Sequence, residues 1–300
     1  MFDVLVVGGS FAGLSAAMQL ARARRTVCVV DSGTPRNRFA AESHGFFGQD
    51  RMAPSHMVAT AREKLLAYPT VTFVADSVVG AEHQGTHIAV TLSSGRSLLA
   101  SKLILAFGLT DEMLPIPGLK ERWGHSVVHC PYCHGFEFDG GPLGVLSVSP
   151  LSVHQALLIP EWGPTTFFLN GQPAPDDSSM AQLAQRGVVI EQTPVAALEG
   201  EGQELSGVRL IDGRVVEVVG LYFAPKTSFQ SPLAEQLGCA VDDGPFGKII
   251  RTDEMKLTTV PGVYAAGDIA RAPHNATFAS ADGVMAGASA HRALVFERLG

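Results

Sequence analysis

Two cysteines separated by two residues are the strongest chemical signal in the sequence. They lie in the run His129-Cys130-Pro131-Tyr132-Cys133-His134-Gly135. Two thiols at this spacing can form one disulfide, and imidazoles on either side can stabilise a thiolate or move a proton. We therefore expect Cys130, Cys133, His134 and His129 to be the catalytic residues of a thiol–disulfide reaction.

The same cysteine spacing also occurs in zinc sites and in the Cys-x-x-Cys-His motif that attaches haem. A zinc site needs two more ligands, but the sequence has no second cysteine pair, and His125 could reach only in a strained geometry. Covalent haem needs a distal axial ligand and, in most settings, a secretion route, whereas this sequence opens directly on an apolar strand. A redox disulfide is the favoured interpretation, and no bound metal is expected.

The N-terminal residues have the pattern of a dinucleotide-binding βαβ unit. An apolar strand (3–7) leads into a glycine-rich turn (8–13), a helix of small residues (14–24) and a second strand (26–31). The glycines of such a turn let the backbone approach a pyrophosphate, and an acidic residue after the second strand holds the ribose. The predicted cofactor-binding residues here are Gly8, Gly9, Ser10, Phe11, Ala12, Gly13 and Asp31, with Ser10 in place of the middle glycine.

A second, weaker copy of this unit follows in the middle of the chain. Its expected parts are a strand (143–148), a loop (149–150), a helix (151–160) and a strand (165–169). Serines stand where the three glycines would be, at Ser147, Ser149 and Ser152. Between positions 141 and 207, Arg186 is the one Lys or Arg, so a 2′-phosphate would find little to neutralise it. NADPH binding here is therefore doubtful, although backbone amides and serine hydroxyls could still hold a pyrophosphate.

Composition limits the class of protein. The chain has 300 residues, 46% of them hydrophobic and 17% charged, with a net charge of -7, which suits an α/β enzyme with a large core. A single basic cluster on an acidic chain does not predict nucleic-acid binding. No stretch is long and apolar enough to predict a membrane span, and four cysteines are too few for a secreted disulfide framework. These features predict a cytoplasmic protein.

Three motifs together resemble the low-molecular-weight thioredoxin reductase family of flavoproteins. They are the glycine-rich turn 8–13, the central Cys-Pro-Tyr-Cys at 130–133 and the late run 261–268, Pro-Gly-Val-Tyr-Ala-Ala-Gly-Asp. The resemblance spans the whole chain and implies a homodimer of two-domain, Rossmann-like α/β subunits. It also implies an FAD domain (1–113 and 229–300) split by an inserted domain (114–228) that carries the two cysteines.

The resemblance places further FAD-binding residues on the sequence. It puts the flavin-side loop on Gly267 and Asp268, and a second turn on Ala106, Phe107 and Gly108. The family's Arg-Gln-Ala appears here as His274, Asn275 and Ala276, so that Asn275 and Ala276 are expected at the flavin while a charge is lost. Arg38, His44 and Gln49 are also expected to face the cofactor, because of their position after the first βαβ unit.

Two departures from the family bring the chain closer to the branch of gliotoxin and holomycin dithiol oxidases. The acid that usually follows the second cysteine is His134, and the second nucleotide loop has lost its glycines. In that branch a small-molecule dithiol reduces the enzyme disulfide, and electrons pass through FAD to O2. The resemblance then implies that Cys130 exchanges with the substrate thiol, that Cys133 lies against the flavin and forms the charge-transfer thiolate, and that His134 or His129 carries protons.

Two other function classes remain open at this stage. One is an NAD(P)H- or ferredoxin-linked reductase of a thioredoxin-like protein. The other is a flavin-binding redox sensor without catalytic turnover. The sequence does not identify the thiol substrate or the electron partner.

Overall fold

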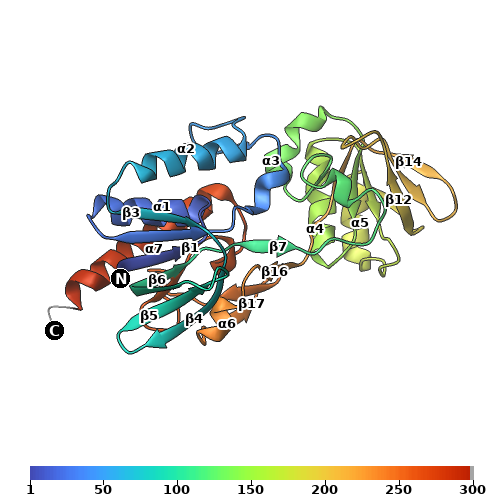
Figure 1. Cartoon of the computed structure of the whole chain (residues 1–300). Coiled ribbons are helices and arrows are strands. Elements are labelled where there is room, and N and C mark those ends of the chain that lie inside the picture. The colour runs from blue at the N-terminus through green and yellow to red at the C-terminus, as the bar shows by residue number, and fades with distance from the viewer. Residues whose placement is uncertain (298–300) are drawn as a thin grey trace. The chain divides into compact units, whose positions relative to one another are not determined.

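The computed structural model describes residues 1–297, and it confirms the expected α/β class with parallel sheets (Figure 1). The first of its two units is built on a seven-stranded sheet with the order β3-β2-β1-β6-β5-β4, in which β19 also pairs with β6. The strands are β1 (Phe2–Val7), β2 (Val27–Asp31), β3 (Val71–Ala75), β4 (Val78–Gln84), β5 (His87–Leu92), β6 (Ser97–Leu105) and β19 (Val263–Ala265).

Both faces of this sheet are buried, which explains its unbroken apolar strands. In β1, Val4 and Val6 pack into one hydrophobic cluster, while Leu5 and Val7 pack into the cluster on the other face. The helices α1 (Phe11–Arg22), α2 (Pro54–Leu66) and α7 (Ala276–Phe296) belong to the same unit. The parallel pairing of β1 with β2, β6 with β1 and β19 with β6 brings the carboxyl ends of these strands to one edge.

Glycines allow α7 to lie directly on the backbone of α1. A Cβ added at Gly283 would stand 2.0 Å from the carbonyl oxygen of Ala12, and one at Gly287 would stand 2.5 Å from that of Ala16. At both positions, a side chain larger than that of glycine would overlap the backbone of α1. The small residues of α7 are therefore explained by packing.

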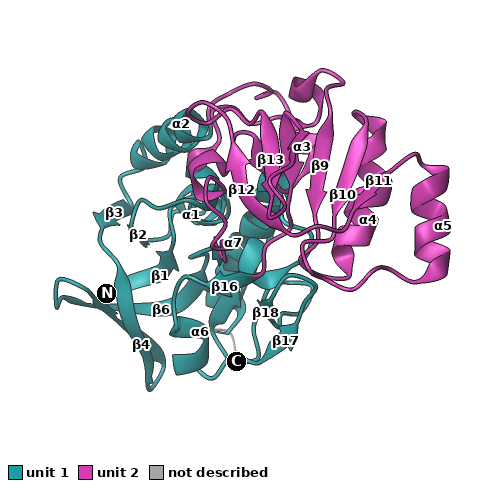
Figure 2. Ribbon diagram, turned by 90° about the vertical axis from the view of Figure 1, so that its right-hand side faces the viewer, with its two compact units in different colours: residues 1–38, 54–110, 227–300 teal, residues 39–53, 111–226 magenta. Residues whose placement is uncertain are grey.

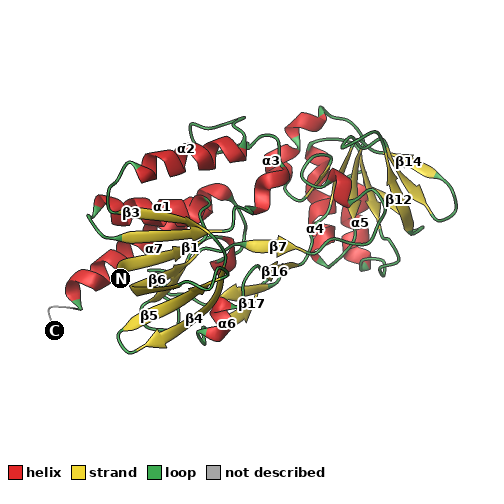
Figure 3. Ribbon diagram, in the orientation of Figure 1, coloured by secondary structure: helices red, strands yellow, loops and turns green. Residues whose placement is uncertain are grey.

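The second unit contains a five-stranded parallel sheet with the order β11-β10-β9-β15-β8 and an antiparallel sheet of β12, β13 and β14 (Figure 2). Helices α4 and α5 lie beside the parallel strands (Figure 3). The element bounds are β8 (Val127–Val128), β9 (Leu143–Leu146), α4 (Leu151–Leu158), β10 (Thr165–Phe168), α5 (Asp177–Gln185), β11 (Val189–Glu191), β12 (Val195–Glu199), β13 (Gly207–Leu210), β14 (Val215–Glu217) and β15 (Gly220–Tyr222).

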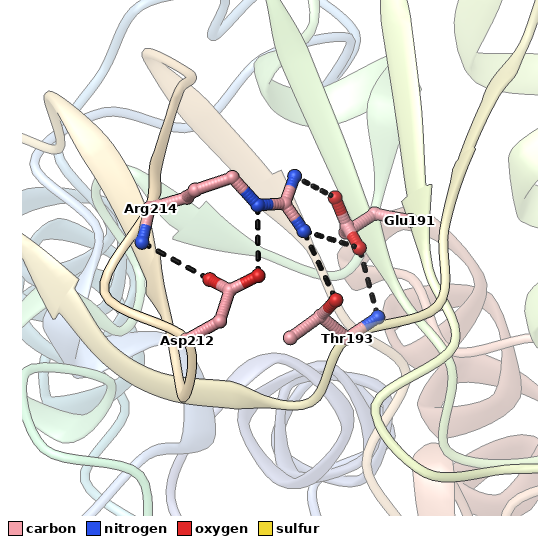
Figure 4. A network of polar contacts seen from close by, with 4 residues as sticks. All are labelled: Glu191, Thr193, Asp212 and Arg214. Carbon is pink, nitrogen blue, oxygen red and sulfur yellow. Dashed lines mark hydrogen bonds and ion pairs between the residues drawn. The ribbon is translucent and has the colours of Figure 1, made fainter.

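An arginine ties the two sheets of this unit together (Figure 4). Arg214 donates to Glu191 at 2.8 Å, to Asp212 at 2.8 Å and to the hydroxyl of Thr193 at 3.0 Å. The hydrogen bond from Arg214 lowers the pKa of Glu191 to about 2. The end of β11 is thus fixed to the turn between β13 and β14.

The division of the chain differs in detail from the sequence expectation. Unit 1 comprises residues 1–38, 54–110 and 227–300, and unit 2 comprises residues 39–53 and 111–226. Residues 39–53 therefore fold with the cysteine-bearing unit, whereas the sequence expectation kept them in the first domain. One reason is that Phe39 packs against Gly124, where a Cβ would lie 2.6 Å from that of Phe39. Such a long-range contact leaves no periodic signal in the sequence.

The remaining elements are short. They include β7 (Leu109–Asp111), which pairs with β16 (Thr227–Phe229), α6 (Leu233–Gln236), and the antiparallel pair β17 (Val241–Asp243) and β18 (Lys248–Ile250). Within residues 1–297 no helix has the length and apolarity needed to cross a membrane.

The contact between α7 and α1 predicts the effect of one added methyl group. Gly283→Ala should lower the free energy of unfolding by about 1–3 kcal/mol, because the new Cβ must displace the backbone of α1. Gly80→Ala is the matched control, since its Cβ would meet Thr91 at an ordinary 3.7 Å. Urea unfolding of the two variants measures the difference, and equal stability would contradict this account of the packing.

Candidate active site

The glycine-rich turn of unit 1 has a backbone that only glycine can supply at two positions. Gly8 has a φ of 108°, and a Cβ there would lie 2.2 Å from the carbonyl oxygen of Ala106. A Cβ at Gly13 would lie 1.8 Å from the carbonyl oxygen of Gly8. The turn after β1, the segment after β6 and the start of α1 are therefore packed backbone to backbone.

This turn has the features of an anion-binding cradle. Ser10 precedes α1 without a side-chain cap, and the first turn of the helix has no acidic residue. The N–H of Gly9 donates to Asp31 Oδ1 at 3.0 Å, at the end of β2. A Cβ on Gly267, which has a φ of 84°, would lie 3.0 Å from that of Ala12. The predicted turn, the ribose acid and the late glycine thus meet at one edge, and they fit the pyrophosphate and ribose of a dinucleotide.

Polar contacts at the same edge involve a residue that the sequence did not reveal. Arg36, in the short helix η1 (Arg36–Phe39), lies with its Nη1 3.1 Å from Asp268 Oδ2 and 2.8 Å from His274 Nδ1. Asn275 caps α7, because its Oδ1 accepts from the N–H of Thr277 at 2.8 Å, and Ala276 is the first residue of that helix. No spacing rule links position 36 to position 268.

The three residues expected at the cofactor by position alone lie in different surroundings. Arg38 donates to the carbonyl oxygen of Pro35 at 2.9 Å, and the N–H of Gln49 donates to that of Phe46 at 2.9 Å. His44 folds with unit 2, where its Nε2 is 3.5 Å from Glu137 Oε1. Their role as cofactor residues stays a prediction.

The two cysteines lie together at the start of a one-turn helix, α3 (Pro131–His134). Cys130 precedes the helix, and its Sγ is 2.7 Å from that of Cys133, with no disulfide bond between them. Pro131 at the first helical position favours this helix start. The sequence prediction of a close thiol pair therefore agrees with the geometry.

An aromatic side chain that the sequence did not point to braces this helix. The ring of Trp162 lies 5.4 Å from that of Tyr132, edge to face. A Cβ at Gly135 would come within 2.5 Å of the Trp162 ring, so this glycine is needed for the helix to rest there. His129, before the cysteines, packs its ring 6.0 Å from that of Trp123, and its carbonyl oxygen accepts from Gln155 at 2.9 Å.

The thiol pair is electrostatically asymmetric. The hydrogen bond from Cys133 lowers the pKa of Cys130, against the opposing effect of burial. Donating that hydrogen bond, together with burial, raises the pKa of Cys133. The reduced pair therefore holds its negative charge on Cys130, whereas the sequence expectation placed the thiolate on Cys133, because Cys133 is the donor of the hydrogen bond between them.

His134 is a neutral base at neutral pH. Burial, helped by nearby His44, lowers its pKa to about 4, while Glu137 acts in the opposite direction. The His44 and His134 rings are 6.4 Å apart in an edge-to-face arrangement. A neutral imidazole at this place can accept a proton from a thiol.

In unit 2, the loop that corresponds to the dinucleotide turn forms hydrogen bonds with the side chain of one of its own serines. The Oγ of Ser152 accepts from the N–H of Val148 at 3.0 Å and from that of Ser149 at 3.3 Å. Ser152 is fully buried. Arg186 donates to the carbonyl oxygen of Leu157 at 3.1 Å and to Glu161 at 2.6 Å. The N–H groups of Val148 and Ser149 and the side chain of Arg186 therefore already have hydrogen-bond partners within the protein.

Metal-ligating residues do not gather in the described part of the chain. Among residues 1–297 no group of three or more His, Cys, Asp and Glu side chains is arranged to hold a metal ion.

The asymmetry of the thiol pair predicts selective alkylation. In the reduced protein, iodoacetamide should modify Cys130 well before Cys133, because the thiolate is the nucleophile. The rate at Cys130 should also reach its plateau at a lower pH than that of an ordinary thiol. Peptide mapping by mass spectrometry at several pH values measures both, with the buried Cys28 and Cys239 as internal references. Faster labelling of Cys133 would contradict the assignment.

Comparisons with known proteins agree with this geometry. The family model described as pyridine nucleotide-disulphide oxidoreductase matches residues 2–157 and 170–283. The thioredoxin reductase tcpT of Claviceps purpurea is 34% identical, covering 89% of this chain and 86% of that protein.

Two solved structures are similar over almost the whole chain. An oxidoreductase from Agrobacterium tumefaciens is 48% identical, covers 98% of this chain and 99% of that one, and has a TM-score of 0.94. The structure of HlmI is 36% identical, covers 99% of this chain and 93% of that one, and has a TM-score of 0.93. The chain therefore belongs to the pyridine nucleotide-disulphide oxidoreductase family and is an oxidoreductase of the thioredoxin reductase type, as its three motifs predicted.

Proposed function

We propose that the protein is an FAD-dependent dithiol oxidase, which converts a small-molecule dithiol to a disulfide with O2 as the electron acceptor. The observation that carries this proposal is the loop of residues 147–152 in unit 2. We call it the closed loop, because two of its backbone N–H groups donate to the side chain of Ser152. The cysteine pair supplies the thiol chemistry, and the cradle of unit 1 supplies a place for one dinucleotide.

The closed loop argues against a nicotinamide as the electron donor. A dinucleotide loop binds pyrophosphate with backbone N–H groups that have no other acceptor. Here the N–H groups of Val148 and Ser149 both donate to the buried hydroxyl of Ser152. A ligand would have to break both hydrogen bonds, and the region's basic residue, Arg186, is held by Glu161. The alternative that this loop still cradles a pyrophosphate is therefore disfavoured.

The residues of unit 2 can carry out disulfide exchange. A substrate thiol gives its proton to solvent and attacks the Sγ of Cys130 in the oxidised enzyme, the Cys130–Cys133 bond breaks, and the electron pair leaves on Cys133, which takes up a proton from solvent. The second substrate thiol loses its proton to neutral His134 and displaces Cys130. The substrate leaves as a disulfide, two electrons poorer, and the enzyme is left with the negative charge on Cys130 that its lowered pKa favours.

The residues of the unit 1 cradle would hold the cofactor. Its pyrophosphate would lie at the turn Gly8–Gly13 and the start of α1, and its ribose at Asp31. When bound, FAD accepts the two electrons of the dithiol and gives them to O2, with hydrogen peroxide as the product. A homodimer and a cytoplasmic location are part of the same proposal, on the family resemblance and the cysteine content.

The second candidate function is a reductase of a thioredoxin-like protein that takes electrons from NAD(P)H or ferredoxin. The specific observation in its favour is the name of the fungal relative, a thioredoxin reductase. It would need a donor site that the loop at Ser152 does not offer in its closed form. A flavin sensor without turnover has less support, because a sensor does not require two histidines beside the dithiol.

Dithiol turnover in air tests the proposal. With dithiothreitol as the substrate and no nicotinamide present, the flavin-loaded protein should consume O2 and form disulfide and hydrogen peroxide in equal amounts. Cys133→Ser should lose this turnover by at least about a hundredfold and keep its yellow colour, because exchange needs both thiols. Cys239→Ser is the matched control and should behave like the wild type.

Two results would overturn the oxidase assignment. One is normal turnover of Cys133→Ser, which would remove the disulfide from the mechanism. The other is the absence of dithiol oxidation in air together with reduction of a disulfide substrate by NAD(P)H or reduced ferredoxin, which would favour the reductase.

A further inference from the structure

Three side chains from distant parts of unit 1 form a polar cluster at the predicted cofactor edge. Arg36 comes from η1, Asp268 from η5 (Asp268–Ala270) and His274 from the segment before α7. Arg36 Nη1 is 3.1 Å from Asp268 Oδ2 and 2.8 Å from His274 Nδ1. The side chains of Arg36 and Asp268 are only 16% and 20% exposed, so water screens their interaction weakly.

Asp268 is next in sequence to a glycine that packs against the start of α1. It directly follows Gly267, whose added Cβ would lie 3.0 Å from that of Ala12 in the first turn of α1. That helix start, without a side-chain cap or an acidic residue, favours a bound anion. A carboxylate beside it would repel a pyrophosphate unless a cation neutralises it, and Arg36 is the cation in contact.

The short contact with Arg36 fixes the protonation state of His274. A guanidinium can only donate, so Nδ1 of His274 must be the acceptor and carry no proton. A protonated imidazole would present an N–H to the guanidinium and repel it. Arg36, which contacts His274, also pairs with Asp268, and the ring of Phe246, from the turn between β17 and β18, lies 5.5 Å from the imidazole.

We propose that His274 is a positioning residue for cofactor binding: its neutral imidazole holds Arg36 on Asp268, and its protonation weakens the affinity for FAD. The inference rests on FAD being the cofactor of the proposed function. It assigns a role to the histidine that stands in place of the family's arginine. The side chain acts through Arg36 and Asp268.

Titration of FAD into the full-length chain after removal of flavin, followed by the quenching of FAD fluorescence, tests the proposal. As the pH is lowered from about 8 and His274 gains a proton, the dissociation constant of the wild type should rise about tenfold. His274→Gln keeps an acceptor for Arg36 at every pH, so its affinity should equal that of the wild type at high pH and stay constant. Arg36→Met should bind FAD about tenfold more weakly than the wild type does at about pH 8 and should weaken no further on acidification, and Arg36→Lys should recover part of the loss.

Arg251→Met is the matched control, since it removes another arginine–aspartate pair of unit 1, with Asp242, and should leave FAD affinity unchanged. A pH dependence that persists in His274→Gln, or wild-type affinity in Arg36→Met, would overturn the inference while leaving the oxidase proposal in place. A wild-type chain that binds no FAD at all would overturn both. The readout is binding, so it does not depend on which substrate or electron acceptor the enzyme uses.

Discussion

The close approach of backbone segments around the first turn is the constraint on which unit 1 depends. The Gly8 and Gly13 positions leave no space for a Cβ, since each would meet a carbonyl oxygen at 2.2 Å or less. The same requirement recurs at Gly283, which rests on the backbone of Ala12. These contacts bring the ends of β1 and β6 and the start of α1 together, and α7 closes the arrangement. The anion-attracting helix start exists because small residues hold it in place.

The two βαβ units of the chain share a topology but differ in the hydrogen bonds made at the turn after the first strand. In unit 1 the turn is lined by glycines, and Ser10 makes no side-chain capping hydrogen bond at the start of α1. In unit 2 the corresponding loop has a buried serine hydroxyl, Ser152 Oγ, that accepts from two backbone amides. A backbone N–H that already donates inside the protein is not available to a ligand. Such a hydrogen bond therefore weakens pyrophosphate binding, as the loss of a glycine from the loop also does. This difference supports one dinucleotide site, with a dithiol as the other redox partner.

The sequence predicted the local elements well because their signals are local. The apolar strands, the helix of small residues at 11–22 and the second strand–helix–strand at 143–168 all have short-range patterns. The thiol pair was predictable from spacing, and the family from three motifs. Arg36, Trp162 and the acceptor role of Ser152 were not, because each depends on a contact between segments that only the folded chain brings together. The place of residues 39–53 in unit 2 was missed for the same reason.

In the proposed mechanism, electrons enter the enzyme from a dithiol, and unit 2 does not take a nicotinamide. Anaerobic titration of the flavin-loaded protein tests it most directly, with the visible flavin absorbance followed during addition of NADPH, then NADH, then dithiothreitol. The account predicts that only the dithiol bleaches the flavin and that air restores the colour. Bleaching by a stoichiometric amount of NADPH or NADH would contradict it and would show that the loop at Ser152 opens to bind a dinucleotide.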